Sequence, residues 1–193
     1  MSCTPISDKA AFILANTRPR EVPLVPEISL RVADEAVPLW QKTEEDLGEM
    51  GLPPPFWAFA WAGGQVLARY ELDHAPIVPG KDVLALASGS GLGGIAAMKA
   101  GARRVRAADI DPFACAAIAI NAGLNAVAVS ASSDDLLATA DDGRWDVVLA
   151  GDIFYERDTA ERAFAFLARH AARGAAILIG DPSRTYLPRS RLA

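Results

Sequence analysis

From Lys81 onward, short apolar runs alternate with segments whose apolar residues recur at helical spacing. The predicted strands are 82–87, 103–109, 125–130, 144–151 and 175–180. The predicted helices between them are 91–101, 111–123, 134–140 and 157–174. Strands that alternate with helices are typical of βαβ units. The pattern therefore predicts an α/β domain with a doubly wound parallel sheet.

The first eighty residues lack this alternation. We therefore expect an N-terminal extension, 1–80, ahead of an α/β core at 81–193. The elements predicted in the extension are a helix over 7–17, a strand over 28–32, a helix over 38–50, an extended loop at 53–55 and a helix from about Trp61.

Composition narrows the class of protein and of ligand. The chain has 193 residues, of which 51% are hydrophobic and 22% charged, as in one globular domain. Its net charge of −5 disfavours nucleic acid, which binds clustered lysine and arginine, and favours a small molecule or a basic protein surface. Two cysteines outside any CxxC pair predict neither a disulfide framework nor a metal site. No stretch is typical of a signal peptide or a membrane span, so the expected location is the cytoplasm.

A glycine-rich loop follows the first strand of the predicted core. The segment 88–94, SGSGLGG, joins that strand to a helix, and glycine lets the backbone turn tightly and approach a ligand closely. The next strand ends at Asp109, where a carboxylate accepts hydrogen bonds from both hydroxyls of a ribose. Loop and acid together predict an adenosine-type ligand. The same glycines also match the dinucleotide fingerprint, so a nicotinamide dehydrogenase remains an alternative.

Four segments carry a resemblance to a known family: 51–70, GLPPPFWAFAWAGGQVLARY; 83–97, VLALASGSGLGGIAA; 107–125, AADIDPFACAAIAINAGLN; and 147–158, VVLAGDIFYERD. They resemble the seven-β-strand, class I protein lysine methyltransferases. Within that class they are most similar to the electron-transfer flavoprotein β-subunit lysine methyltransferase group, and more distantly to the ribosomal protein L11 methyltransferases. The resemblance extends over nearly the whole chain from about Glu27. Neither the aromatic block 54–65, PPFWAFAWAGGQ, nor the Asp-x-x-Tyr of 152–155 is expected in a dehydrogenase.

The resemblance implies S-adenosylmethionine as cofactor, S-adenosylhomocysteine as product, and a site at the carboxyl ends of the strands. The implied cofactor-binding residues are Trp61, Ser88, Gly89, Gly91, Asp109, Ile110, Asp134 and Gly151. Within this set the two glycines would line the methionine moiety, Asp109 would hold the ribose, and Ile110 would pack on the adenine. The adenine amino group would meet Asp134 or Asp135. The implied catalytic residues are Asp152 and Tyr155, and the implied substrate-binding residues are Phe56 and Trp57.

The resemblance also implies a fold and a partner. The fold is the Rossmann-like class I methyltransferase sheet with an N-terminal helical extension, and the chain stops short of the last two strands of that sheet. The extension would supply a lid over the cofactor and the aromatic block on the substrate side. Ala85 stands where the family usually has an acid that supports the methionine end. The partner would be a protein that presents a lysine, such as an electron-transfer flavoprotein subunit, with neither nucleic acid nor membrane involved.

The expected reaction is an in-line methyl transfer, which requires a neutral lysine amine. An aromatic channel would favour the neutral amine by desolvation, and Asp152 would orient it by hydrogen bonding. Two alternatives stay open beside the dehydrogenase. One is a small-molecule N-methyltransferase; the other is a degenerate module that binds the cofactor without turnover, consistent with Ala85 and the short C-terminus.

Overall fold

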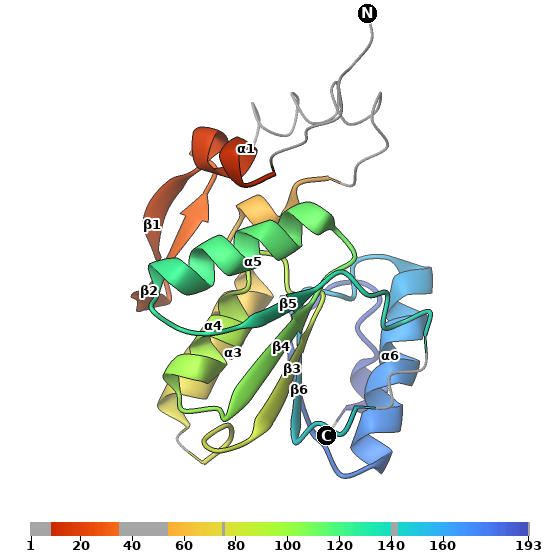
Figure 1. Cartoon of the computed structure of the whole chain (residues 1–193). Helices are drawn as coiled ribbons and strands as arrows, with labels where there is room; N and C mark the ends of the chain where they lie inside the picture. The colour runs from red at the N-terminus through yellow and green to blue at the C-terminus, as the bar shows by residue number, and fades with distance from the viewer. Residues whose placement is uncertain (1–8, 35–53, 75, 140–142, 193) are drawn as a thin grey trace, which may run out of the picture.

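The predicted parallel sheet forms the centre of the protein. The computed structural model describes residues 9–34, 54–74, 76–139 and 143–192 (Figure 1). The sheet contains five parallel strands in the order β5-β4-β3-β6-β7. They are β3 (Asp82–Leu86), β4 (Arg104–Ala108), β5 (Ser130–Ser132), β6 (Val147–Gly151) and β7 (Ala176–Gly180). The chain order reverses between β3 and β6, and such a switch point is where doubly wound sheets bind ligands.

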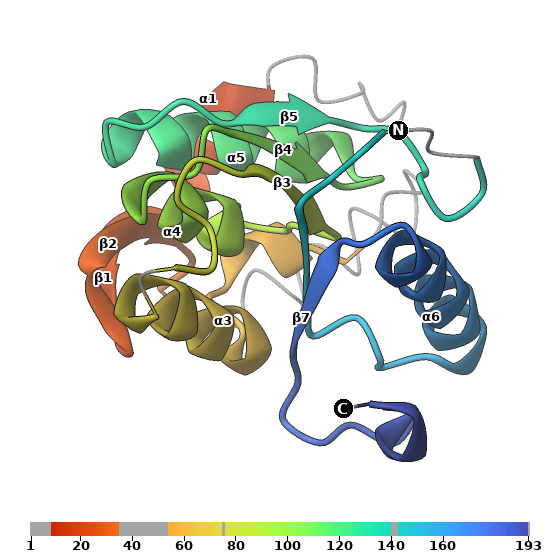
Figure 2. The same ribbon diagram turned by 90° about the horizontal axis from the view of Figure 1, so that it is seen from below.

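Helices cover both faces of this sheet, which confirms the predicted fold class. One face carries α3 (Ala62–Asp73), α4 (Leu92–Lys99) and α5 (Pro112–Leu124), and the other carries α6 (Arg157–Ala172) (Figure 2). The side chains of β3 alternate between the two cores. Val83 packs on the α4 and α5 side, whereas Leu84 packs on the α6 side. Both are fully buried, as expected for a central strand. Within the described residues no helix is long and apolar enough to cross a membrane.

The first turn of α3 lies directly against the end of β7. A Cβ atom added to Gly63 would overlap the carbonyl oxygen of Gly180, and the reverse is also true. The two backbones therefore touch with no side chain between them. This contact fixes the start of α3 beside the carboxyl end of the sheet.

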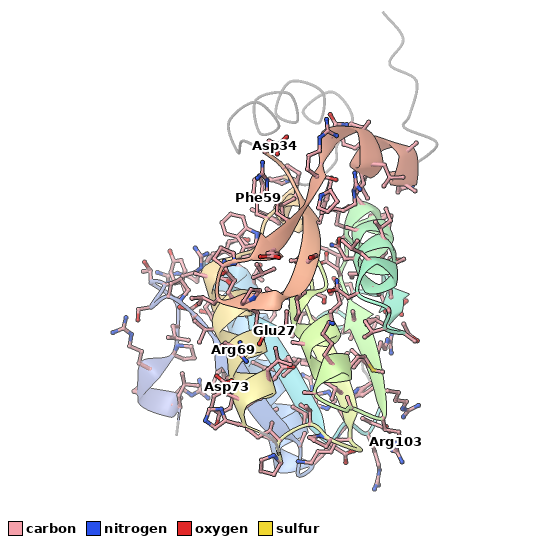
Figure 3. The ribbon with its side chains drawn as sticks, turned by 90° about the vertical axis from the view of Figure 1, so that its left-hand side faces the viewer. Glu27, Asp34, Phe59, Arg69, Asp73 and Arg103 are labelled. Carbon is pink, nitrogen blue, oxygen red and sulfur yellow. The ribbon has the colours of Figure 1, made fainter. Side chains whose placement is uncertain are left out.

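The N-terminal part forms a small antiparallel hairpin packed on the helices. The hairpin consists of β1 (Arg18–Val22) and β2 (Val25–Val32). The helix α1 (Lys9–Asn16) precedes it, and the 3-10 turn η1 (Phe56–Ala58) follows farther along the chain. Apolar residues of the hairpin, among them Ile28 and Leu30, pack against α3, α4 and α5. Arg69 of α3 pairs with Glu27 of β2 at 2.9 Å and with Asp73 at 2.7 Å (Figure 3). Because these ion pairs are exposed, the apolar contacts contribute most of the attachment.

Several predicted elements differ from the observed ones. The strand β1 was not predicted, because it contains Pro19, and proline is unfavourable in most strands. Proline is tolerated there because, among the described residues, β1 pairs with β2 alone. The predicted strand over 28–32 is confirmed as part of β2, and the helix from about Trp61 is confirmed as α3. The predicted helix over 38–50 lies outside the described residues.

The predicted helix over 134–140 is wrong. Its described part, 134–139, forms a turn in which Asp135 Oδ1 accepts hydrogen bonds from the backbone N–H groups of Leu137 and Ala138. Aspartate often competes with a helix in this way. The strand before it, predicted over 125–130, is shorter and shifted to β5. The last element is a 3-10 turn, η2 (Arg189–Arg191).

Glu71 of α3 is expected to lower the stability of the protein at neutral pH. It is fully buried, and neither carboxylate oxygen has a hydrogen-bond partner among the described residues. Burial raises the pKa of Glu71 well above its ordinary value, so the folded state binds a proton that the unfolded state releases near pH 4.5. Its contribution to stability is therefore complete below that pH and is lost as the pH rises toward the folded-state pKa.

Replacing Glu71 by methionine should raise the free energy of unfolding at pH 8 by about 1–3 kcal/mol, a few degrees in melting temperature. Thermal melts of both proteins between pH 5 and 8 test this, with the exposed Glu161→Gln as control. The assignment fails if the difference between wild type and Glu71→Met does not grow with pH.

Candidate active site

A cavity of about 550 Å³ opens at the carboxyl ends of β3, β4 and β6, beside the switch point. The turn η1 and the first turns of α3 complete its wall. All but one of the residues predicted for the site line this cavity, namely Phe56, Trp57, Trp61, Ser88, Gly89, Asp109, Ile110, Asp134, Gly151, Asp152 and Tyr155. The structure thus brings together residues that are almost a hundred positions apart in the sequence.

The glycine loop forms the floor between β3 and α4. Gly89 has φ +50°, and a Cβ atom on it would meet nothing closer than 3.8 Å, so the glycine leaves open space above the loop. Gly91 is the exception among the predicted residues, because it does not line the cavity. It has φ +85° at the start of α4 and packs against Ile118, where a Cβ would lie 3.2 Å from the side chain. Its observed role is therefore the turn itself.

Asp109 connects the end of β4 to this loop. One carboxylate oxygen accepts the N–H of Gly89 at 2.8 Å, and the other accepts the N–H of Asp111 at 3.0 Å. Burial raises the pKa of Asp109, and these two backbone donors oppose the rise. A carboxylate offers about four acceptor positions, so the two oxygens keep capacity for the hydroxyls of a ribose.

The end of the cavity that is far from Asp152 is more open, and its acidic residues form ion pairs with arginines of the protein. Ile110 is 64% exposed, as expected for an apolar side chain that awaits a flat ligand. Asp134 pairs with Arg106, and Asp135 pairs with Arg162 of α6 at 3.1 Å. Either acid keeps free acceptor positions for an adenine amino group.

Asp152 follows β6 and holds three elements together. Its N–H donates to Gly180 at the end of β7, and its Oδ2 accepts the N–H of Gly64 in α3 at 3.0 Å. The residue has φ +55°, a left-handed conformation that non-glycine residues adopt mainly at functional or strained sites. This backbone turn keeps the carboxylate in the cavity wall.

Arg184 is a cavity residue that the sequence did not reveal. It lies in the turn after β7, and its Nη2 is 3.1 Å from Asp152 Oδ1. The last segment that carries the family resemblance ends at residue 158, whereas a parallel sheet brings the loop after every later strand to the same edge. The position of Arg184 in the turn after the last predicted strand was therefore the feature of the sequence that could have indicated a site residue.

Aromatic side chains wall the cavity beside Asp152. We call Phe56, Phe59, Trp61 and Tyr155 the aromatic wall; their neighbouring ring centroids lie 5.7–6.0 Å apart. The indole N–H of Trp61 donates to the carbonyl of Phe56 at 2.8 Å, which orients that ring. Trp57, by contrast, is 3% exposed and stacks on Phe113 of α5, so most of its surface belongs to the core.

The residues present suit S-adenosylmethionine. Ser88 Oγ is buried and has no hydrogen-bond partner among the described residues, which leaves a polar atom for a ligand to satisfy. Among the residues that the structure describes, the charged ones that line the cavity are Asp109, Asp111, Asp134, Asp135, Asp152, Arg162 and Arg184. Acids outnumber arginines, and aromatic faces adjoin them, which favours a sulfonium or ammonium group. Ala85 also lines the cavity and presents a methyl group there, where the resemblance led us to expect an acid in the family.

Comparison with known proteins gives one consistent family. A model of the ribosomal protein L11 methyltransferases (PrmA) matches residues 67–156. The electron transfer flavoprotein beta subunit lysine methyltransferase of Xenopus laevis is 38% identical over 175 residues, which cover 90% of this chain and 70% of that protein. The human protein of the same name is 39% identical over 165 residues, with 83% and 61% covered. A homolog from Caenorhabditis elegans is 33% identical, with 94% and 79% covered.

A solved structure agrees with these relatives. The ribosomal protein L11 methylase of Lactobacillus delbrueckii subsp. bulgaricus superposes with a TM-score of 0.50 and 28% identity, over 62% of this chain and 60% of that one. The chain spans 61–79% of the length of the curated relatives named here. The predicted class and cofactor are confirmed by these similarities. The chain belongs to the electron-transfer flavoprotein β-subunit lysine methyltransferase family and is a class I, S-adenosylmethionine-dependent methyltransferase.

Proposed function

We propose that the protein transfers a methyl group from S-adenosylmethionine to the ε-amine of a lysine on a protein substrate. The observation that carries the proposal is the position of Asp152, in the cavity wall next to the aromatic wall. An acid beside aromatic faces is suited to an amine and to the cation that each methylation leaves.

The chain's own residues would favour the neutral amine and align it. A lysine amine has a reference pKa near 10.4, so its deprotonation at pH 7 costs roughly 4.6 kcal/mol. Apolar surroundings lower that cost, because they destabilise the charged form. Asp152 would orient the amine by accepting a hydrogen bond, and the proton would be lost to solvent. The cofactor supplies the activated methyl group.

A protein substrate is favoured over a small molecule by the openness of the cavity. Tyr155, which belongs to the aromatic wall beside Asp152, is 48% exposed, so a side chain from a large partner has room to enter there. The curated relatives are named for the electron-transfer flavoprotein β subunit. That subunit is therefore the first substrate to test.

The test is transfer of a tritiated methyl group to purified electron-transfer flavoprotein β subunit, with the modified residue located by mass spectrometry. We expect methylated lysine, with S-adenosylhomocysteine binding by calorimetry and no binding of NAD. Methylation of small amines but of no protein would favour the small-molecule alternative. Cofactor binding without transfer to any protein of a cell lysate would favour the degenerate module.

A further inference from the structure

The turn after β7 places the positive charge of Arg184 beside the carboxylate of Asp152. Asp181 Oδ1 accepts the backbone N–H of Arg184 at 2.6 Å and so closes the turn. Ser183 within it has φ +72°, a left-handed conformation that is disfavoured for serine. Asp152 has the same kind of conformation at the end of the neighbouring strand. Both turns are thus held in disfavoured geometry where the two side chains meet.

The ion pair between these turns is sheltered from solvent. The side chains of Arg184 and Asp152 are 30% and 10% exposed. The Nε atom of Arg184 is buried and has no acceptor among the described residues. Screening by water is weak for such a pair, so each charge acts on a third group placed beside it.

Other charges near the pair come from several elements. Asp181 belongs to the same turn as Arg184. The hydroxyl of Tyr155 stays neutral near pH 8, because burial raises its pKa, with a smaller contribution from Glu156. Among the described residues that line the cavity, the other cation is Arg162, which pairs with Asp135 at the far end. Arg184 is therefore the cation that balances Asp152.

This balance affects an amine held by Asp152. An unpaired carboxylate would stabilise the ammonium and raise its pKa, by about one to three units for a close pair. A nearby guanidinium opposes that effect, as a cation lowers the pKa of a neighbouring lysine in other enzymes. An acid paired with an arginine can thus accept a hydrogen bond from a neutral amine without favouring its protonation.

We propose that Arg184 is a positioning residue that acts through Asp152. Its positive charge compensates the negative charge of the carboxylate, so that the site binds the substrate lysine as a neutral amine. This inference rests on the proposed function. No covalent step involves Arg184, and the proton of the lysine leaves to solvent before the amine attacks the methyl group.

The first test is the pH dependence of kcat at saturating electron-transfer flavoprotein β subunit, because kcat reports ionisations within the enzyme–substrate complex. Replacing Arg184 by glutamine should shift the acid limb upward by about one to two pH units, because the carboxylate is left unpaired. Arg184→Lys retains the positive charge and should keep the acid limb near its wild-type position. The matched control is Arg20→Gln, which removes one charge from an exposed Arg–Asp pair on the hairpin and should shift nothing.

A second test needs no turnover. With S-adenosylhomocysteine bound, Arg184→Gln should bind n-butyltrimethylammonium, a permanently charged copy of a methylated lysine side chain, about tenfold more tightly than wild type. Calorimetry measures this at pH 8, and circular dichroism checks folding. If the glutamine variant does not fold, Arg184→Met replaces it.

The outcomes are distinct. A wild-type protein that methylates no lysine would contradict the proposed function, whereas the ammonium measurement would still test the pair. An acid limb that stays in place in folded Arg184→Gln would overturn the inference. Equal shifts in the lysine and glutamine variants would also overturn it, because geometry rather than charge would then be responsible. Failure of both neutral variants to fold would make the pair structural and overturn it as well.

Discussion

Replacing Asp109 by alanine is expected to lower the affinity for S-adenosylhomocysteine by at least about two orders of magnitude. Two hydrogen bonds from a ribose to this carboxylate would each contribute about 1.5–3 kcal/mol, since the acceptor is charged. The substitution also removes the acceptor for the N–H groups of Gly89 and Asp111, so the glycine loop loses its link to β4. Isothermal titration calorimetry measures the loss directly.

Two further variants separate these contributions. Asp109→Asn retains one acceptor oxygen and the shape of the side chain, and we expect it to lose less affinity than the alanine variant. Asp134→Ala removes an exposed acid that already pairs with Arg106, and a small effect is expected. An alanine variant at 109 that binds the cofactor product as well as wild type would refute the ribose assignment.

Replacing Asp152 is expected to abolish measurable methyl transfer while cofactor binding remains. Misplacement of a reacting group by about 1 Å can lower the rate by roughly a hundredfold, and loss of the group that orients the amine should cost at least that much. The more informative variant is Asp152→Asn. Asparagine tolerates the left-handed conformation of this position and can still accept the N–H of Gly64. Asp152→Asn therefore removes the negative charge and retains the backbone conformation and the hydrogen bond to α3.

The measurements are transfer of a tritiated methyl group, calorimetry with S-adenosylhomocysteine, and thermal melting. Asp152→Ala serves as the second variant, and part of its effect will be structural because alanine is strained at φ +55°. If Asp152→Asn fails to fold, the residue is structural rather than catalytic. Full activity in a folded Asp152→Asn would exclude a role for the charge.

The sequence predicted the sheet because its strands are buried and short. In β3 and β6 nearly every residue is apolar and lies between two helical layers, so the signal is strong. The cavity followed from the same pattern, since the loops after β3, β4 and β6 must converge at one edge. The glycines and acids of these loops are close to their strands in the chain, which made them recognisable.

Features that depend on distant contacts were not predictable in this way. Local pattern favoured a helix over 134–140, but the side chain of Asp135 satisfies the backbone in a turn instead. The pairing of β1 with β2 depends on a partner across a turn, and the proline in β1 weakened the strand pattern in the sequence. Arg184 became visible as a site residue only when the register of β6 and β7 placed its turn beside Asp152. For Gly91 the structure adds a role that the motif did not indicate, since its positive φ and its contact with Ile118 support the turn at the start of α4.

The contact between Gly63 and Gly180 restricts how this protein can change over evolutionary time. Neither position can gain a methyl group unless the backbones of α3 and β7 separate, and no single substitution elsewhere restores that space. Gly64, one residue farther along α3, differs: a methyl group there would meet only Leu92, at 3.8 Å. A saturation library selected for folded protein should therefore be depleted of every substitution at Gly63 and Gly180, while Gly64→Ala persists. Residues of the aromatic wall and of the turn after β7 can then change during evolution while Gly63 and Gly180 stay the same.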